Sequence, residues 1–133
     1  MPFIHINVGK PLSVASKQRV CRQATQLIGD LLAKRREVTS VLVESVASDG
    51  WCINGEPPAD ARTTPVHVEI LITAGTNSSA EKSRMIAAMH ALLGEELGAL
   101  PAASYVVIHE LPATDWGYAG STQAARRQAD GGM

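Results

Sequence analysis

The sequence has no long apolar run and no dominant sign of charge. Its 12 Lys+Arg residues against 13 Asp+Glu give a formal net charge of −1, whereas proteins that bind nucleic acid or anionic membranes carry a basic face. No apolar run approaches the ~20 residues of a membrane-spanning helix. The opening segment MPFIHINVGK alternates apolar and polar residues, unlike a secretory signal. We therefore expect neither nucleic acid nor a membrane as a partner.

Cysteine is scarce, and the familiar catalytic motifs are missing. The two cysteines, Cys21 and Cys52, are too few for a disulfide framework, so the cytoplasm, a reducing compartment, is the expected location. The sequence contains no phosphate-cradling glycine-rich loop after a strand, no CxxC and no HExxH. We therefore expect no cofactor.

Histidines are the remaining candidates for a metal site. Three of the four fall in predicted strands and one in a predicted helix, and no pair has the spacing of metal ligands. They are His5, His67 and His109 in strands and His90 in the helix. Histidines with satisfied hydrogen bonds explain this pattern better than a metal centre, so we expect no metal.

The chain is built from a repeated unit. Its 133 residues, 45% of them hydrophobic, suit one globular domain. Several landmark residues recur about 65 positions later. The pairs are Pro2–Pro65, Ser40–Ser104, Val43–Val107, Lys17–Lys82, Arg19–Arg84, Trp51–Trp116 and Gly55–Gly120. We predict a single domain over 1–133 with two copies of one unit, at about 2–58 and 63–125, and a tail at 126–133.

Each unit has the pattern of a strand, a helix and a second strand. Alternation and β-branched residues predict strands at 3–8, 38–46, 66–73 and 104–111. Apolar stripes predict helices from a serine cap at 13 or 16 to about 33, and from a cap at 78 or 79 to about 97. The stripe residues are Val20, Ala24, Leu27, Ile28, Leu31 and Leu32, and then Met85, Ile86, Met89, Leu92, Leu93 and Leu97.

The tandem βαβ order predicts an α+β fold with a four-stranded sheet. Right-handed crossovers place both helices on one face of the sheet. The other face then carries apolar side chains that cannot remain in water, so we expect the chain to oligomerise through this face. A stand-alone ferredoxin-like βαββαβ regulatory domain, which differs in strand order, is an alternative.

Pro2 is the one candidate for catalysis that the residues themselves suggest. It directly follows the initiator methionine, which is commonly removed before a small residue, and it opens a predicted strand. Removal would expose a secondary amine, and apolar surroundings would lower its pKa toward neutrality, where general acid–base catalysis works best. A proline that merely starts a strand is the alternative.

This arrangement resembles the tautomerase superfamily. The first unit is similar to 4-oxalocrotonate tautomerase in the segments PFIHI, TSVLV and GWCINGE, and the segments EL at 110–111 and DWG at 115–117 resemble the family's terminal pattern. The segment AKRR at 33–36 and Tyr105 resemble macrophage migration inhibitory factor and its bacterial relatives. The resemblance covers about residues 2–125 and implies a homotrimer built as a barrel.

The resemblance implies an isomerase that interconverts the keto and enol forms of small 2-oxo acids such as phenylpyruvate. Pro2 matches the family's proton-shuttling proline. Lys34 matches a lysine that binds the substrate carboxylate, and Tyr105 matches a pocket tyrosine from a neighbouring subunit. Trp51 lies where 4-oxalocrotonate tautomerase has a pocket phenylalanine. Pro65, taken as the second unit's equivalent of Pro2, has an amide nitrogen and implies one active site per chain.

The arginines that hold substrate carboxylates in the 4-oxalocrotonate branch are missing. The first would lie near Lys10 and the second is Leu42, while Thr76 stands where dehalogenase and decarboxylase relatives place an arginine. We therefore expect Lys10 among the substrate-binding residues and a mono-anionic 2-oxo acid as the substrate. A non-catalytic binding or structural member of the same fold is the alternative, favoured if Met1 is retained and acylates Pro2.

Overall fold

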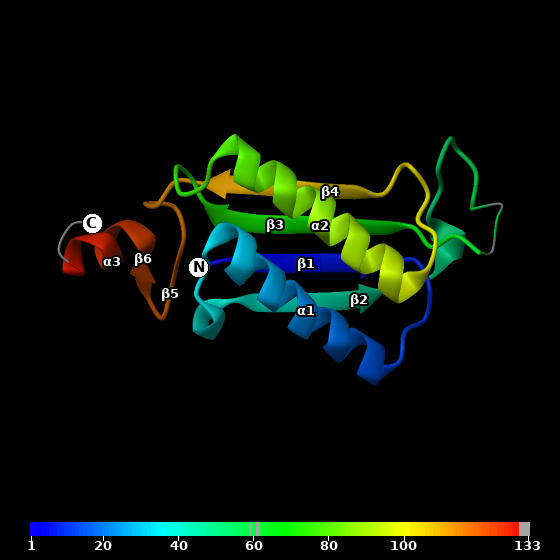
Figure 1. The fold of residues 1–133 in the computed structure, drawn as a ribbon, viewed down its shortest axis with the longest axis horizontal. Coiled ribbons are helices and arrows are strands. Elements are labelled where there is room, and N and C mark those ends of the chain that lie inside the picture. Colours follow the sequence, from blue (N-terminus) through cyan, green and yellow to red (C-terminus); the bar gives the residue numbers. More distant parts are fainter. Residues whose placement is uncertain (59, 61, 131–133) are drawn as a thin grey trace.

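Four long strands and two long helices form the body of the fold in the computed structural model, which describes residues 1–58, 60 and 62–130 (Figure 1). In chain order they are β1 (Phe3–Val8), α1 (Val14–Leu32), β2 (Ser40–Ser45), β3 (Val66–Thr73), α2 (Ser79–Leu97) and β4 (Tyr105–Leu111). A short carboxyl-terminal segment follows, with β5 (Gly117–Tyr118), β6 (Ser121–Thr122) and α3 (Gln123–Ala129).

The four long strands make one sheet in the order β2-β1-β3-β4. The two strands of each unit are parallel neighbours, and the units meet where β1 runs antiparallel to β3, with Phe3 opposite Leu71 and Val8 opposite Val66. This confirms the tandem βαβ prediction. The ferredoxin-like alternative is wrong, because that fold splits each βαβ unit by inserting another strand between its two strands.

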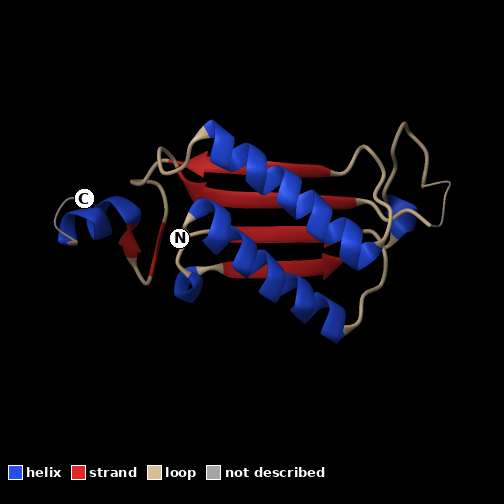
Figure 2. Ribbon diagram, viewed as in Figure 1, coloured by secondary structure: helices blue, strands red, loops and turns tan. Residues whose placement is uncertain are grey.

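Both helices cover the same face of the sheet, as predicted (Figure 2). Ser13 caps α1 by accepting a hydrogen bond from the Ser16 amide at 3.0 Å, and Ser78 caps α2 in a reciprocal capping box with Glu81. These caps decide between the paired serines that the sequence left open.

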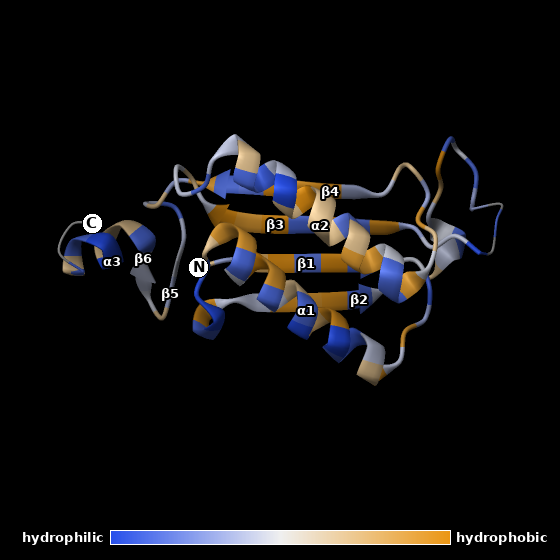
Figure 3. Cartoon of the chain, viewed as in Figure 1, coloured by the Kyte–Doolittle hydropathy of each residue, from blue (hydrophilic) through white to orange (hydrophobic). Residues whose placement is uncertain are grey.

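The core lies between the helices and the sheet, where Figure 3 shows apolar strand segments beneath α1 and α2. From the helices it contains Val20, Ala24, Ile28, Leu32, Met85, Met89, Leu93 and Leu97, and from the strands Ile4, Ile6, Val8, Val43, Val66, Val68, Ile70 and Ile72. Ile86, predicted for the α2 stripe, is 39% exposed. It sits at the edge of the stripe, one residue past Met85, where helical geometry turns the side chain about 100° away from the core.

The second strand of the first unit is shorter than predicted. It starts at Ser40 rather than at 38, because the preceding residues form a single 3-10 turn, η1 (Arg36–Val38). The Thr39 amide donates to the Arg36 carbonyl at 3.2 Å, so this backbone is tied into the turn and not into the sheet.

The repeat is real, but three of its sequence pairings join residues on opposite faces. Helix-facing residues are even-numbered in both β1 and β3, as Ile4 and Val68 illustrate. Structurally equivalent residues of these two strands are therefore an even number of positions apart. Helix-facing residues are odd in β2 and even in β4, as Val43 and Ile108 show. A slip of one residue moves a strand side chain to the other face. The pairings Pro2–Pro65, Ser40–Ser104 and Val43–Val107 are therefore wrong as structural equivalents.

The face of the sheet away from the helices, here called the open face, is less apolar than predicted. It carries the apolar or aromatic residues Phe3, Leu42, Leu71, Tyr105, Val107 and Leu111, but its centre holds His5, Glu44, His67, Glu69 and His109. The face therefore carries the predicted apolar side chains, but around a polar centre that the prediction did not include.

The segment after β4 extends past the end of the sheet where β1 begins (Figure 1). Its hairpin closes tightly, because a Cβ on Gly117 would collide with the Ser121 carbonyl. Helix α3 crosses the predicted boundary at 126 and continues to Ala129, while residues 131–133 of the predicted tail lie outside the described residues. Within the described part of the chain, no helix has the length and hydrophobicity needed to cross a membrane.

Candidate functional site

Pro2 directly precedes β1, an inner strand of the sheet, and so lies at one end of the sheet. It is buried, and its carbonyl accepts a hydrogen bond from the Ser40 amide at 3.2 Å. Since β1 is an inner strand between β2 and β3, neighbours on both sides fix the position of this residue. While Met1 is attached, the Pro2 nitrogen is an amide; removal of Met1 leaves a secondary amine at the same position.

The surroundings of the amino terminus disfavour positive charge. The pKa of the Met1 amino group is lowered below its ordinary value, mainly by burial and further by the positive charges of Lys34 and Arg35. This amine lies one residue from the Pro2 nitrogen. The structure therefore brings Lys34 to the Pro2 end of the sheet.

Lys34 reaches this end because α1 stops just before it. Ala33 takes a left-handed conformation, with φ of 57°, at the helix end. The Lys34 ammonium then donates a hydrogen bond to the Thr76 hydroxyl at 2.9 Å, in the loop between β3 and α2. Burial is the main cause that lowers the Lys34 pKa, while the nearby carboxylates of Glu81 and Glu110 oppose it.

A second lysine nearby has its charge already neutralised. Lys82 donates to the Glu110 carboxylate at 2.6 Å, and Glu110 also accepts from the Gly75 amide. Both contacts lower the Glu110 pKa, the Lys82 hydrogen bond most. Lys34 instead donates to a neutral hydroxyl, so its charge is better placed to meet a bound anion.

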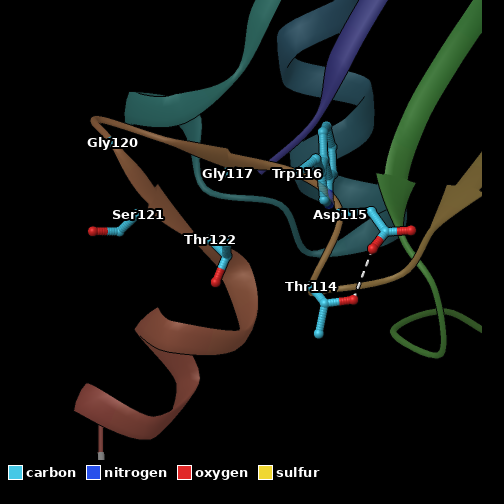
Figure 4. A pocket seen from close by; sticks show the side chains of 7 residues that line it. All are labelled: Thr114, Asp115, Trp116, Gly117, Gly120, Ser121 and Thr122. Carbon is cyan, nitrogen blue, oxygen red and sulfur yellow. Dashed lines mark hydrogen bonds between the residues drawn. The ribbon is translucent and has the colours of Figure 1, made fainter.

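A hollow of about 310 Å³ lies beside this end of the sheet (Figure 4). It is lined by Thr114, Asp115, Trp116, Gly117, Gly120, Ser121 and Thr122. The Trp116 indole Nε1 donates to the Thr73 hydroxyl at 3.1 Å. Phe3, the first residue of β1, lies opposite Leu71, and Thr73 is two residues farther along β3, at the end of the sheet where β1 begins. Trp116 is therefore fixed close to the amino terminus.

The sequence predicted Trp51 as the pocket tryptophan and did not point to Trp116. The repeat contained the signal, since the two tryptophans are one pair of repeated landmarks. Because β1 and β3 are antiparallel, the end of each unit lies near the start of the other. Within one chain, Trp116 is therefore the tryptophan beside Pro2.

The other three predicted substrate-binding residues lie at the opposite end of the sheet. Trp51 packs near Gly9 and Pro65, and a Cβ on Gly9 would be 2.6 Å from Pro65 Cγ and 3.2 Å from Trp51 Cε3. The Lys10 ammonium donates to the Leu97 carbonyl at 3.1 Å. Tyr105 opens β4, opposite His67 at the start of β3. One chain does not bring these residues to Pro2.

The two ends of the sheet differ in the residue that follows each helix cap. Ala33 and Gly98 are the corresponding positive-φ caps of α1 and α2. The residue after the first cap is Lys34, whereas the residue after the second is Ala99. The two ends are therefore chemically different despite the repeat.

Comparisons with known proteins agree with the two-unit organisation. A family profile described as tautomerase enzyme matches residues 2–61 and again 67–126. Probable tautomerase K2 of Dickeya dadantii (strain 3937) is 33% identical over 63 residues, which cover 47% of this chain and 94% of that protein. One such relative therefore corresponds to about half of this chain.

Solved structures share the fold over nearly the whole chain. The F6 fused 4-OT asymmetric trimer is 22% identical with a TM-score of 0.80. The crystal structure of Pt0534 inactivated by 2-oxo-3-pentynoate is 15% identical with a TM-score of 0.82. Each alignment covers 93% of this chain and 98% of the other.

Proposed function

The chain belongs to the tautomerase family, and we propose that it is an isomerase of small 2-oxo acids such as phenylpyruvate, with Pro2 as its general base and acid. The observation that carries the proposal is the placement of Pro2 at a desolvated, cation-flanked strand start. A related fold inactivated by 2-oxo-3-pentynoate supports a 2-oxo acid as the substrate class.

The reaction needs one group that both accepts and donates a proton. In the ketonisation direction, the freed Pro2 amine accepts the proton of the enol hydroxyl, and the ammonium returns a proton to the adjacent carbon. No atom is gained or lost. The burial and the two cations that lower the pKa of the Met1 amine should lower the pKa of a Pro2 amine too, which increases the fraction of free base at a given pH.

Lys34 and Trp116 are the proposed substrate-binding groups from the same chain. The Lys34 ammonium would hold the substrate carboxylate by a charge-assisted hydrogen bond. The Trp116 ring, fixed by its bond to Thr73, would cover the apolar part of the substrate. A site in which only Lys34 holds a carboxylate suits a mono-anionic 2-oxo acid better than a diacid.

The active assembly is proposed to be a homotrimer formed through the open face. The fused 4-OT of similar fold is a trimer, and Tyr105, 63% exposed at the opposite end of the sheet, is available to a neighbouring copy. Trp51 and Lys10, at that same end, would approach Pro2 only from another chain. Light scattering should give about three times 14.1 kDa; a monomer at every concentration would contradict the trimer.

A non-catalytic binding protein of the same fold is the second candidate. It is favoured if Met1 stays on the mature chain, because the acylated Pro2 nitrogen cannot act as a base. Intact mass spectrometry of the natively produced protein separates the two, since the catalytic proposal requires a mass without Met1.

The proposed activity is tested by a screen of enolic 2-oxo acids, starting with phenylpyruvate. Wild type is compared with Pro2→Ala, and Pro11→Ala serves as the matched control because Pro11 is exposed in the turn before α1. We expect Pro2→Ala to lose most of its kcat and Pro11→Ala to keep it. Equal rates in all three proteins would refute Pro2 as the base.

A further inference from the structure

The centre of the open face holds an array of imidazole and carboxylate groups. His5 Nε2 lies 2.5 Å from a Glu44 carboxylate oxygen, and His109 Nε2 lies 3.0 Å from Glu69. His67 Nε2 approaches the same Glu69 oxygen at 4.0 Å. The array crosses all four strands, because β1 and β3 pair His5 directly with Glu69. None of these five residues has a role in the proposed chemistry.

Among the described residues of the four strands, histidines are the only basic groups on this face. None of the open-face positions of β1, β2, β3 and β4, all of which the structure describes, carries a lysine or an arginine. The other titratable group there is Tyr105. In the described residues no group of three or more His, Cys, Asp or Glu side chains is arranged to hold a metal ion. Only protonation of the imidazoles can therefore neutralise Glu44 and Glu69 from within the face.

Burial of the open face between copies of the chain would make protonation of these histidines energetically important. In the single chain the five side chains are between a quarter and half exposed, so water screens them and each pair contributes little. Between copies of the sheet, an unneutralised carboxylate would lose its water at a large free-energy penalty. A carboxylate paired with an imidazolium at hydrogen-bond distance loses far less.

We propose that assembly of the trimer through the open face takes up protons, which pair His5 with Glu44 and His109 with Glu69 as buried ion pairs. The inference rests on the proposed trimer. The assembled state holds more protons than the free chain, so association is strongest where the imidazoles are charged and weakens as pH rises above the ordinary histidine pKa of about 6.5.

Sedimentation of the intact protein tests this linkage. The midpoint of trimer dissociation in urea is measured at pH 6.5, 7.5 and 8.5, in wild type and in Glu44→Gln/Glu69→Gln. Each linked proton changes the association constant about tenfold per pH unit. The association constant of the wild-type trimer should therefore fall at least tenfold for each pH unit. The double variant should stay trimeric at pH 8.5, and the slope of its association constant against pH should be close to zero. His90→Gln, on the exposed side of α2, should keep the wild-type slope.

The outcomes separate this inference from the trimer itself. A trimer whose midpoint is the same at all three pH values overturns the proton linkage and leaves the trimer intact. An equal slope in wild type and in the double variant also overturns it, because the protons then bind elsewhere. A monomer at every pH overturns both the trimer and the linkage.

Discussion

Replacing Lys34 with glutamine tests whether this cation holds the substrate and tunes the base. The change keeps a polar, hydrogen-bonding side chain, one atom shorter, but removes the charge beside the amino terminus. A hydrogen bond to a charged group contributes about 1.5–3 kcal/mol, which corresponds to an increase in KM of about 10- to 150-fold at 1.36 kcal/mol per tenfold. The contact to the carboxylate is made in both ground and transition states, so kcat at saturation should change much less.

The same substitution should also move the pH profile. Lys34 lowers the pKa of the amine at the start of the chain, so its removal should raise that pKa. The base is active when unprotonated, and the ascending limb of kcat/KM should therefore shift to higher pH. A purely structural role for Lys34 would not move this limb in a defined direction.

The assay is steady-state kinetics on phenylpyruvate between pH 5.5 and 9. Lys17→Gln is the matched control, because Lys17 lies near the opposite end of α1. Lys34→Arg retains the charge and should recover part of the lost affinity. If Lys34→Gln keeps both the wild-type KM and the wild-type ascending limb, Lys34 neither binds the carboxylate nor tunes the base.

Four further substitutions test the pocket and the fold. Trp116→Ala should lower kcat/KM about tenfold in the same kinetic assay, through loss of aromatic contact with the substrate; an unchanged value would remove Trp116 from the pocket. Met89→Ala should destabilise the protein by about 2–5 kcal/mol because Met89 is fully buried, whereas the half-exposed Ile86→Ala should lose less than about 1 kcal/mol; urea denaturation giving equal losses would contradict the observed α2 core. Ser78→Ala removes one side of the capping box and should lower the unfolding free energy by about 1 kcal/mol; no change in urea denaturation would mean the cap is not needed.

The order of elements was predictable because it depends on local signals. Serine caps and apolar stripes mark both long helices, and alternation marks β1. The sequence could not choose between Ser13 and Ser16, since either hydroxyl can cap and only the backbone geometry decides. It misplaced Ile86 for a related reason, because a stripe read from periodicity has no sharp edge.

The placement of side chains on the two faces was less predictable. Side chains alternate between the two faces of a strand, so the face depends on whether the residue number is odd or even. A repeat whose spacing varies between 63 and 65 residues does not determine this alternation. The array around Glu69 illustrates the consequence, since its histidines were assigned to strands but not to one shared face. Trp116 was missed because its nearness to Pro2 follows from the antiparallel contact of β1 with β3, which neither unit reveals alone.

The most direct test of the account compares one protein before and after its amino terminus is freed. A cleavable extension ahead of Pro2 keeps every side chain but leaves the Pro2 nitrogen as an amide; specific proteolysis then makes Pro2 the first residue, as intact mass confirms. We predict negligible ketonisation of enol-phenylpyruvate before cleavage and a large gain in kcat/KM after it. Equal activity of the two forms would contradict the claim that the Pro2 amine is the catalytic base.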